Sequence, residues 1–171
     1  NALNRQAVFT PSTSSNTFTY DTDDPEAVIT HPLTARTTSL NEIRGTAFDA
    51  LPGLIERVEL RVRRLTAPVQ YWDPITNGGE FNAIAAGAAW FVAASSEAPT
   101  WSRWYVSSPA LSVDLVSGRS YELEARARDN SGLYSTVYTT TTILDSYTPE
   151  TTLTFPQASA MVYVSSLNNN T

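Results

Sequence analysis

The sequence contains no cysteine and no lysine, and it has one histidine and one methionine. Without cysteine there are no disulfides, no thiolate metal ligands and no cysteine nucleophile. All 11 basic residues are arginines, and a guanidinium does not supply the amine needed for an intramolecular Lys–Asn crosslink. We therefore expect stability to come from packing, hydrogen bonding and, as one option, a bound cation.

Long apolar runs and positive charge are also scarce. No apolar run approaches the roughly 20 residues of a membrane-spanning helix, so we expect no membrane span in these residues. The net charge of −6 leaves no basic stripe for nucleic acid. His31 lies beside Pro32, and nothing near it resembles a nucleophile elbow. We expect neither a nucleic-acid partner nor an enzyme.

One segment of the chain occurs twice. Residues 21–32 (DTDDPEAVITHP) return as residues 145–156 (DSYTPETTLTFP), 124 residues later. Self-similarity at a fixed interval is typical of domain arrays, and this interval has the size of one β-sandwich domain. We therefore expect a complete domain at 21–145. Residues 1–20 would be the terminal strand of a preceding repeat, and residues 146–171 would open a following one.

The two partial repeats contain short apolar strands, which include Val8 and Phe9 at one end and Val162, Tyr163 and Val164 at the other. A lone strand cannot pair its own backbone. We expect further copies or adjacent repeats to complete these strands head to tail. Exchange of strands between subunits and continuation of one long polypeptide are both open.

Alternating apolar and polar residues separated by turn signals predict an all-β sandwich of short antiparallel strands. The predicted strands are 27–30, 42–49, 57–65, 69–72, 88–94, 101–106, 121–129 and 134–144. The predicted turns are 51–53, 77–79, 117–118 and 129–132, which are rich in Gly, Pro, Asn and Asp. Abundant Ser and Thr favour strands and an extracellular location.

Two of these strands carry charged side chains on one face and apolar side chains on the other. If 57–63 and 121–128 are antiparallel neighbours, a simple register pairs Arg63 with Glu122, Arg61 with Glu124, and Glu59 with Arg126. We expect a solvated charged face. Exposed ion pairs contribute only about 0.2–1 kcal/mol each, so their main effect would be to fix the register.

Several fragments together resemble the bacterial immunoglobulin-like repeats of large secreted and surface proteins. They are 43–47 (IRGTA) with Asp49, 58–62 (VELRV), 71–73 (YWD), 115–118 with Tyr121, and 125–132 (ARARDNSG). Their order matches the B strand, the C strand, a C–C′ hairpin, and the F strand with its FG turn. The resemblance implies an immunoglobulin-like antiparallel sandwich without catalysis, used as a spacer or assembly module. The long segment 73–104 departs from shorter repeats, and we expect a Trp-rich hairpin insertion there.

Acidic residues predict a cation site at one pole of such a sandwich. The start of strand A, the BC loop and the FG loop share that pole, which would gather five aspartates: Asp21, Asp23, Asp24, Asp49 and Asp129. Carboxylate oxygens in this number suit Ca²⁺, which takes six to eight oxygens at about 2.3–2.6 Å. The second linker, 145–149 (DSYTP), lacks the paired acids. The alternative is that these aspartates cap turns and strand ends without a metal.

Aromatic residues are concentrated between positions 71 and 105, namely Tyr71, Trp72, Trp90, Trp101, Trp104 and Tyr105. Exposed rings could stack on sugars or anchor a neighbouring subunit, whereas buried rings would fill the core. We therefore expect a structural repeat of a prokaryotic extracellular filament, sheath, stalk or surface protein. The alternative is an adhesive, glycan-binding module that uses the Trp-rich insertion.

Overall fold

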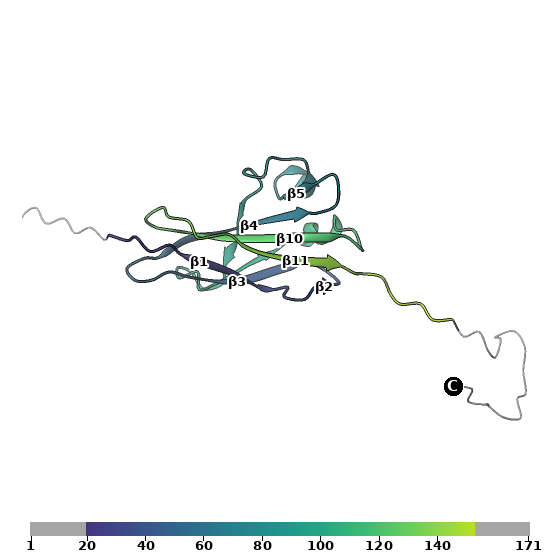
Figure 1. Ribbon diagram of the computed structural model, residues 1–171, viewed down its shortest axis with the longest axis horizontal. Coiled ribbons are helices and arrows are strands. Elements are labelled where there is room, and N and C mark those ends of the chain that lie inside the picture. The colour runs from purple at the N-terminus through teal and green to yellow at the C-terminus, as the bar shows by residue number, and fades with distance from the viewer. Residues whose placement is uncertain (1–19, 153–171) are drawn as a thin grey trace, which may run out of the picture.

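The structure is a computed structural model in which residues 20–152 are described. This part of the chain is mostly β-structure and forms two sheets (Figure 1). The prediction of an all-β protein is therefore confirmed. The predicted assembly strands at 8–9 and 162–164 lie outside the described residues.

The first sheet has four strands in the order β1-β3-β9-β8. They are β1 (Glu26–His31), β3 (Glu42–Phe48), β9 (Arg103–Ser107) and β8 (Ala94–Ser95). All neighbours in this sheet are antiparallel. Buried and exposed residues alternate along β3, as expected for a strand with one face on the core.

The second sheet has the order β2-β11-β10-β4-β5-β6, and β7 also pairs with β4. The strands are β2 (Arg36–Thr37), β11 (Tyr138–Leu144), β10 (Ser120–Asp129), β4 (Ile55–Arg64), β5 (Gln70–Asp73), β6 (Glu80–Asn82) and β7 (Phe91–Val92). Only β2 runs parallel to its neighbour, β11. The long pair β4 and β10 forms the centre of this sheet.

The strand predicted at 88–94 is wrong. The chain forms two separate two-residue strands there, β7 on β4 and β8 on β9, which belong to different sheets. Ala93, which is buried between them, donates its N–H to the Val58 carbonyl at 2.9 Å. An alternating pattern does not show that the chain changes sheet within one run.

The core lies between the two sheets. Ile29, Ile43 and Trp104 come from the first sheet, and Leu60 and Leu123 come from the second. The apolar sides predicted for β4 and β10 are therefore the buried sides. Full burial of such a side chain stabilises the fold by about 1.5–3 kcal/mol.

A glycine makes room for the largest side chain of the first sheet. Gly45 pairs with Trp104, and a Cβ at Gly45 would lie 2.1 Å from the Trp104 ring. The ring therefore occupies the space that any other residue at this position would fill. A substitution at Gly45 would displace Trp104 or separate the strands.

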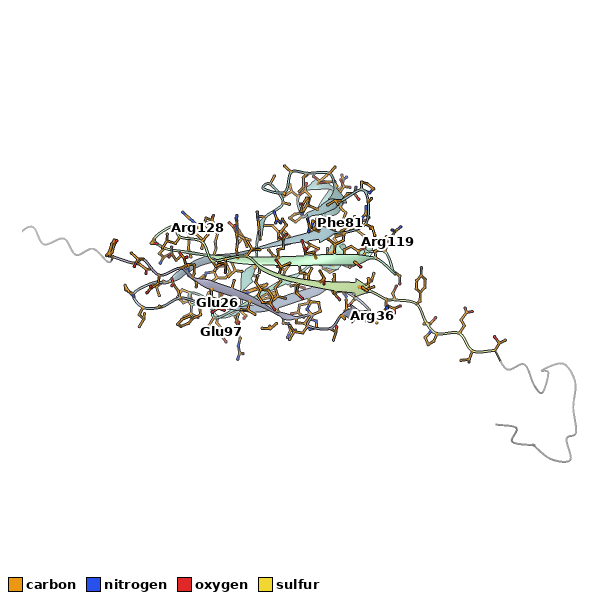
Figure 2. The ribbon with its side chains drawn as sticks, viewed as in Figure 1. Glu26, Arg36, Phe81, Glu97, Arg119 and Arg128 are labelled. Carbon is orange, nitrogen blue, oxygen red and sulfur yellow. The ribbon has the colours of Figure 1, made fainter. Side chains whose placement is uncertain are left out.

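The chain enters and leaves the sandwich at opposite ends (Figure 1). We name these ends the N-terminal pole, where β1 begins, and the C-terminal pole, where β11 ends. Arg128 lies toward the N-terminal pole, and Arg36 and Arg119 lie toward the C-terminal pole (Figure 2). Of the helices in residues 20–152, η1 (Thr76–Gly78) and α1 (Pro109–Val113), neither is long and apolar enough to cross a membrane.

Candidate cation site at the N-terminal pole

Three carboxylates from three separate parts of the chain meet at the N-terminal pole. Asp21 precedes β1, Asp49 directly follows β3, and Asp129 is the last residue of β10. One carboxylate oxygen of each lies within 4.8 Å of the others. We refer to these three residues as the acidic cluster. The topology brings them together because β3 and β10 both end at the pole where β1 begins.

Two of the five predicted ligands are not part of this cluster. Asp23 and Asp24 are exposed, and the backbone N–H of Asp23 donates to Asp21 Oδ1 at 3.2 Å. The sequence indicated which pole would be acidic. It could not show which carboxylates of the linker turn inward.

Asp129 has its own hydrogen-bond partners. The carboxylate is buried, and it accepts bonds from the Ser131 hydroxyl at 2.9 Å and from the Gly132 and Leu133 N–H groups at 2.7 and 2.8 Å. Burial acts to raise the pKa of Asp129, but these hydrogen bonds outweigh it and lower the pKa below the ordinary value. Asp129 therefore also caps the turn after β10, as the alternative interpretation expected.

Asp49 has no such partners. Both of its carboxylate oxygens are buried, and neither accepts a hydrogen bond. Burial, followed by the charges of Asp21 and Asp129, raises the pKa of Asp49. The nearby Ala50 amide acts in the opposite direction but does not reach hydrogen-bonding geometry. Asp49 is thus a half-buried residue whose two carboxylate oxygens are buried and lack a donor.

A glycine turn lies against the same carboxylates. A Cβ at Gly53 would lie 2.3 Å from Asp49 Oδ2 and 2.6 Å from Asp21 Oδ2. A side chain at position 53 would therefore require the carboxylates of Asp49 and Asp21 to shift. A hollow beside the turn is lined by Asp21, Gly53, Leu54, Asn130 and other residues of the two loops. The sequence marked residues 51–53 as a turn but gave no signal that the turn borders a carboxylate cluster.

No arginine among residues 20–152 pairs with the acidic cluster, although Arg128 lies toward the same pole. None of the ion pairs among residues 20–152 involves Asp21, Asp49 or Asp129. The donor set is three carboxylates, and hard oxygen ligands suit Ca²⁺ or Mg²⁺ rather than softer metals. The arrangement can therefore hold a hard divalent cation.

The outer face of β4 and β10 carries the charged residues that the sequence predicted to pair, and we name it the charged face. All three predicted rungs are present in the antiparallel register. The closest nitrogen–oxygen distances are 2.6 Å for Arg63–Glu122, 2.6 Å for Arg61–Glu124 and 2.7 Å for Arg126–Glu59. The register prediction is confirmed.

The prediction that this face is solvated is wrong. Residues between β6 and β7 lie over it, and the Trp90 ring lies 4.5 Å from the Arg61 guanidinium and 4.2 Å from that of Arg126. Arg61 also donates to the Ala86 carbonyl at 2.9 Å. Glu59 and Glu124 are only 7% and 8% exposed. Burial acts to raise the pKa of Glu59, but the bonds from Arg57 and Arg126 lower it.

Two of the predicted contact residues belong to the core. Trp72 and Trp104 are each 1% exposed, so neither offers a ring face to a sugar or to a subunit. Trp72 packs edge-on against Phe81, with 5.5 Å between the ring centroids. Trp104 Nε1–H donates to the Thr46 carbonyl at 3.0 Å. Trp104 lies on β9, between β3 and β8. It therefore belongs to the first sheet and not to an insertion.

The other four rings do not form one platform. Tyr71 and Trp90 lie over the second sheet beside Arg61. Tyr105 faces outward from the first sheet, because it neighbours the inward-facing Trp104 on β9. Trp101 packs against the core. The outer faces of the two sheets point in opposite directions, so these rings cannot stack together on one glycan.

No match to a protein-family model, a curated protein or a solved structure was found for this chain. The immunoglobulin-like resemblance therefore stays a prediction, and the function rests on the geometry of this chain.

Proposed function

We propose that this chain contains an immunoglobulin-like module that serves as a structural unit of an extracellular filament or surface protein and assembles head to tail. The observation that carries this proposal is the position of the repeated segment. Its first copy begins at Asp21 at the N-terminal pole, and its second copy begins at Asp145 directly after β11, where the chain leaves the opposite pole. Units joined in this way extend along one axis.

The strand order supports an immunoglobulin-like assignment. Read as A, B, E and D, the first sheet is β1, β3, β9 and β8; read as A′, G, F, C and C′, the second is β2, β11, β10, β4 and β5. At the start of β10, the Tyr121 hydroxyl accepts a hydrogen bond from the Val116 N–H at 2.8 Å. A tyrosine that bonds back to the chain before strand F is typical of this fold.

Exposed apolar side chains at both poles support end-to-end contact. Phe48 ends β3 at the N-terminal pole and Leu51 and Leu54 lie in the loop that follows, whereas Leu33 follows β1 and Val113 ends α1 near the C-terminal pole. Apolar groups that stay in water favour association. A contact between two different poles repeats without closing, so it extends a fibre.

The test is the oligomeric state of the 171-residue chain, measured by light scattering and small-angle X-ray scattering over a range of concentrations. We expect oligomers that grow in length at constant cross-section. Leu51→Glu and Val113→Glu, one at each pole, should reduce this growth. Ile75→Glu is the matched control, because Ile75 is equally exposed but lies on the turn between β5 and β6. A chain that stays monomeric at all concentrations, or that responds equally to all three substitutions, would contradict head-to-tail assembly.

A further inference from the structure

We propose that the acidic cluster binds one Ca²⁺ ion through the carboxylates of Asp21, Asp49 and Asp129. This site goes beyond the proposed structural role and does not depend on it, because all three ligands lie within one module.

The first argument is the Asp49 carboxylate. Buried polar groups in proteins are almost always hydrogen-bonded, and buried charges are paired or bind metals. The two Asp49 oxygens are buried, have no donor and lie beside two other acids. The other buried carboxylates of residues 20–152 have hydrogen-bond donors. Arginines donate to Glu59 and Glu124, and backbone N–H groups of the following turn donate to Asp129. Asp49 is the exception among the described acids, and a cation in the cluster would supply the missing partner.

The second argument is the shape of the site. A side chain at position 53 would crowd the carboxylates of Asp49 and Asp21, and the adjoining hollow reaches the cluster at Asp21. The ligands come from a linker and from two strand ends, so they need not form a regular polyhedron. Ca²⁺ accepts irregular sets of six to eight oxygens with monodentate or bidentate carboxylates and water, whereas Mg²⁺ requires a near-ideal octahedron. The geometry therefore favours Ca²⁺.

The third argument comes from the repeated segment. The second copy keeps an aspartate at the position of Asp21, namely Asp145, but has Tyr147 and Thr148 where the first copy has Asp23 and Asp24. The structure shows that only Asp21 of the first copy joins the cluster. The loss of the paired acids therefore removes no ligand. The repeat keeps an acid at the position of Asp21, although Asp145 itself pairs with Arg36 at 3.3 Å, and it changes the two acids that lie outside the cluster.

The test is thermal unfolding of the full chain, stripped with EDTA and titrated with CaCl₂ to about 20 mM at constant ionic strength. Calcium sites of extracellular modules have dissociation constants of about 10⁻⁴–10⁻³ M. We expect the unfolding temperature to rise and saturate in this range, because an ion that binds only the folded state stabilises it. MgCl₂ at the same concentrations should give a smaller rise.

Two variants locate the site. Asp49→Asn should weaken the apparent affinity for Ca²⁺ at least tenfold, whereas Asp24→Asn, an exposed acid of the same linker, should leave it unchanged. In EDTA, without Ca²⁺, the Asp49→Asn variant should unfold at the same temperature as the unchanged chain or at a higher one, because the substitution removes repulsion between like charges. Asp21→Asn lies outside the strands, and it provides the same test of affinity if Asp49→Asn does not fold.

Three results would overturn the proposal. They are no saturable rise in unfolding temperature up to 20 mM Ca²⁺, an unchanged affinity in both Asp49→Asn and Asp21→Asn, and an equal loss of affinity in Asp24→Asn. None of these results bears on head-to-tail assembly, which is measured separately by scattering in the absence of Ca²⁺.

Discussion

The charged face and the acidic cluster both bury carboxylates, and β10 contributes to both. On the charged face, Glu124 of β10 receives two bonds from Arg61 at 2.6 and 2.8 Å. At the end of the same strand, Asp129 lies beside Asp49, which receives none. One region contains its own counter-charges, and the other does not.

The difference shows how a buried acid is accommodated in this protein. On the charged face, each carboxylate lies opposite an arginine on the neighbouring strand, and Trp90 covers the guanidiniums of Arg61 and Arg126. On this face each carboxylate has its counter-charge within the fold, although Arg63 Nε is buried without an acceptor, and the pairs contribute to the register of β4 and β10. In the acidic cluster the fold supplies neutral donors to Asp129 but neither a donor nor a counter-charge to Asp49, so we expect the stability of this pole to depend on ions from the solvent. We expect the charged face to be insensitive to ions and the acidic cluster to be sensitive to them.

Among these predictions, Glu59→Gln should lower the free energy of unfolding most, because it removes the charge that faces two guanidiniums. Glu59 contacts Arg57 at 2.8 Å and Arg126 at 2.7 Å. Loss of a buried, hydrogen-bonded charge partner costs about 2–4 kcal/mol, and urea unfolding measures it. Glu122→Gln is the control, since Glu122 is less buried and pairs only with Arg63; it should cost less than about 1 kcal/mol. Equal losses of stability in the two variants would show that the cover by Trp90 does not strengthen the ion pairs beneath it.

Trp90→Ala should lower the stability by an intermediate amount. It should also make the charged face sensitive to ions, as we expect of the acidic cluster. Its ring covers Arg61 and Arg126, and a cation–π contact contributes about 0.5–2 kcal/mol. We expect a loss of about 1–3 kcal/mol and a new dependence on NaCl, because the exposed ion pairs become screened. Trp90→Phe should retain part of the stability. A Trp90→Ala variant that is equally stable at low and high salt would contradict this account.

The smallest expected effect is a change in the pKa of Asp73. This residue represents a third arrangement, in which neutral donors bind the carboxylate. It accepts bonds from the Thr76 hydroxyl at 2.6 Å and from the Ile75 N–H at 2.9 Å, which lower its pKa from 3.8 to about 2. Since the pKa is lower in the folded state, its stabilising contribution is present above about pH 4 and is lost as the pH falls toward 2. Carboxyl NMR titration measures this pKa, and Thr76→Val should raise it. An unchanged pKa in that variant would remove the hydroxyl as the cause.

Much of the second sheet could be predicted because its information is local. Alternation in β4 and β10 assigned their buried sides, and matching the charges predicted the register that the structure shows. The position of Trp90 over the charged face could not be predicted, because the residues between β6 and β7 have no periodicity to indicate which face of the sheet they cover. The burial of Trp72 and Trp104 was missed for a similar reason. Aromatic residues close in sequence were treated as one group, although they lie on different sheets.

For the acidic cluster, the sequence by itself determined that aspartates precede β1 and end β3 and β10, and hence that one pole would be acidic. Only the tertiary structure decided that Asp21 turns inward while Asp23 and Asp24 stay in water, and that Asp49 is buried without a donor. The physical reason is that burial and hydrogen-bond satisfaction depend on all the elements packed around a carboxylate. At this pole they depend on the Gly53 turn, which is close to Asp49 in sequence but far from Asp21, so its approach to Asp21 could not be read from local sequence.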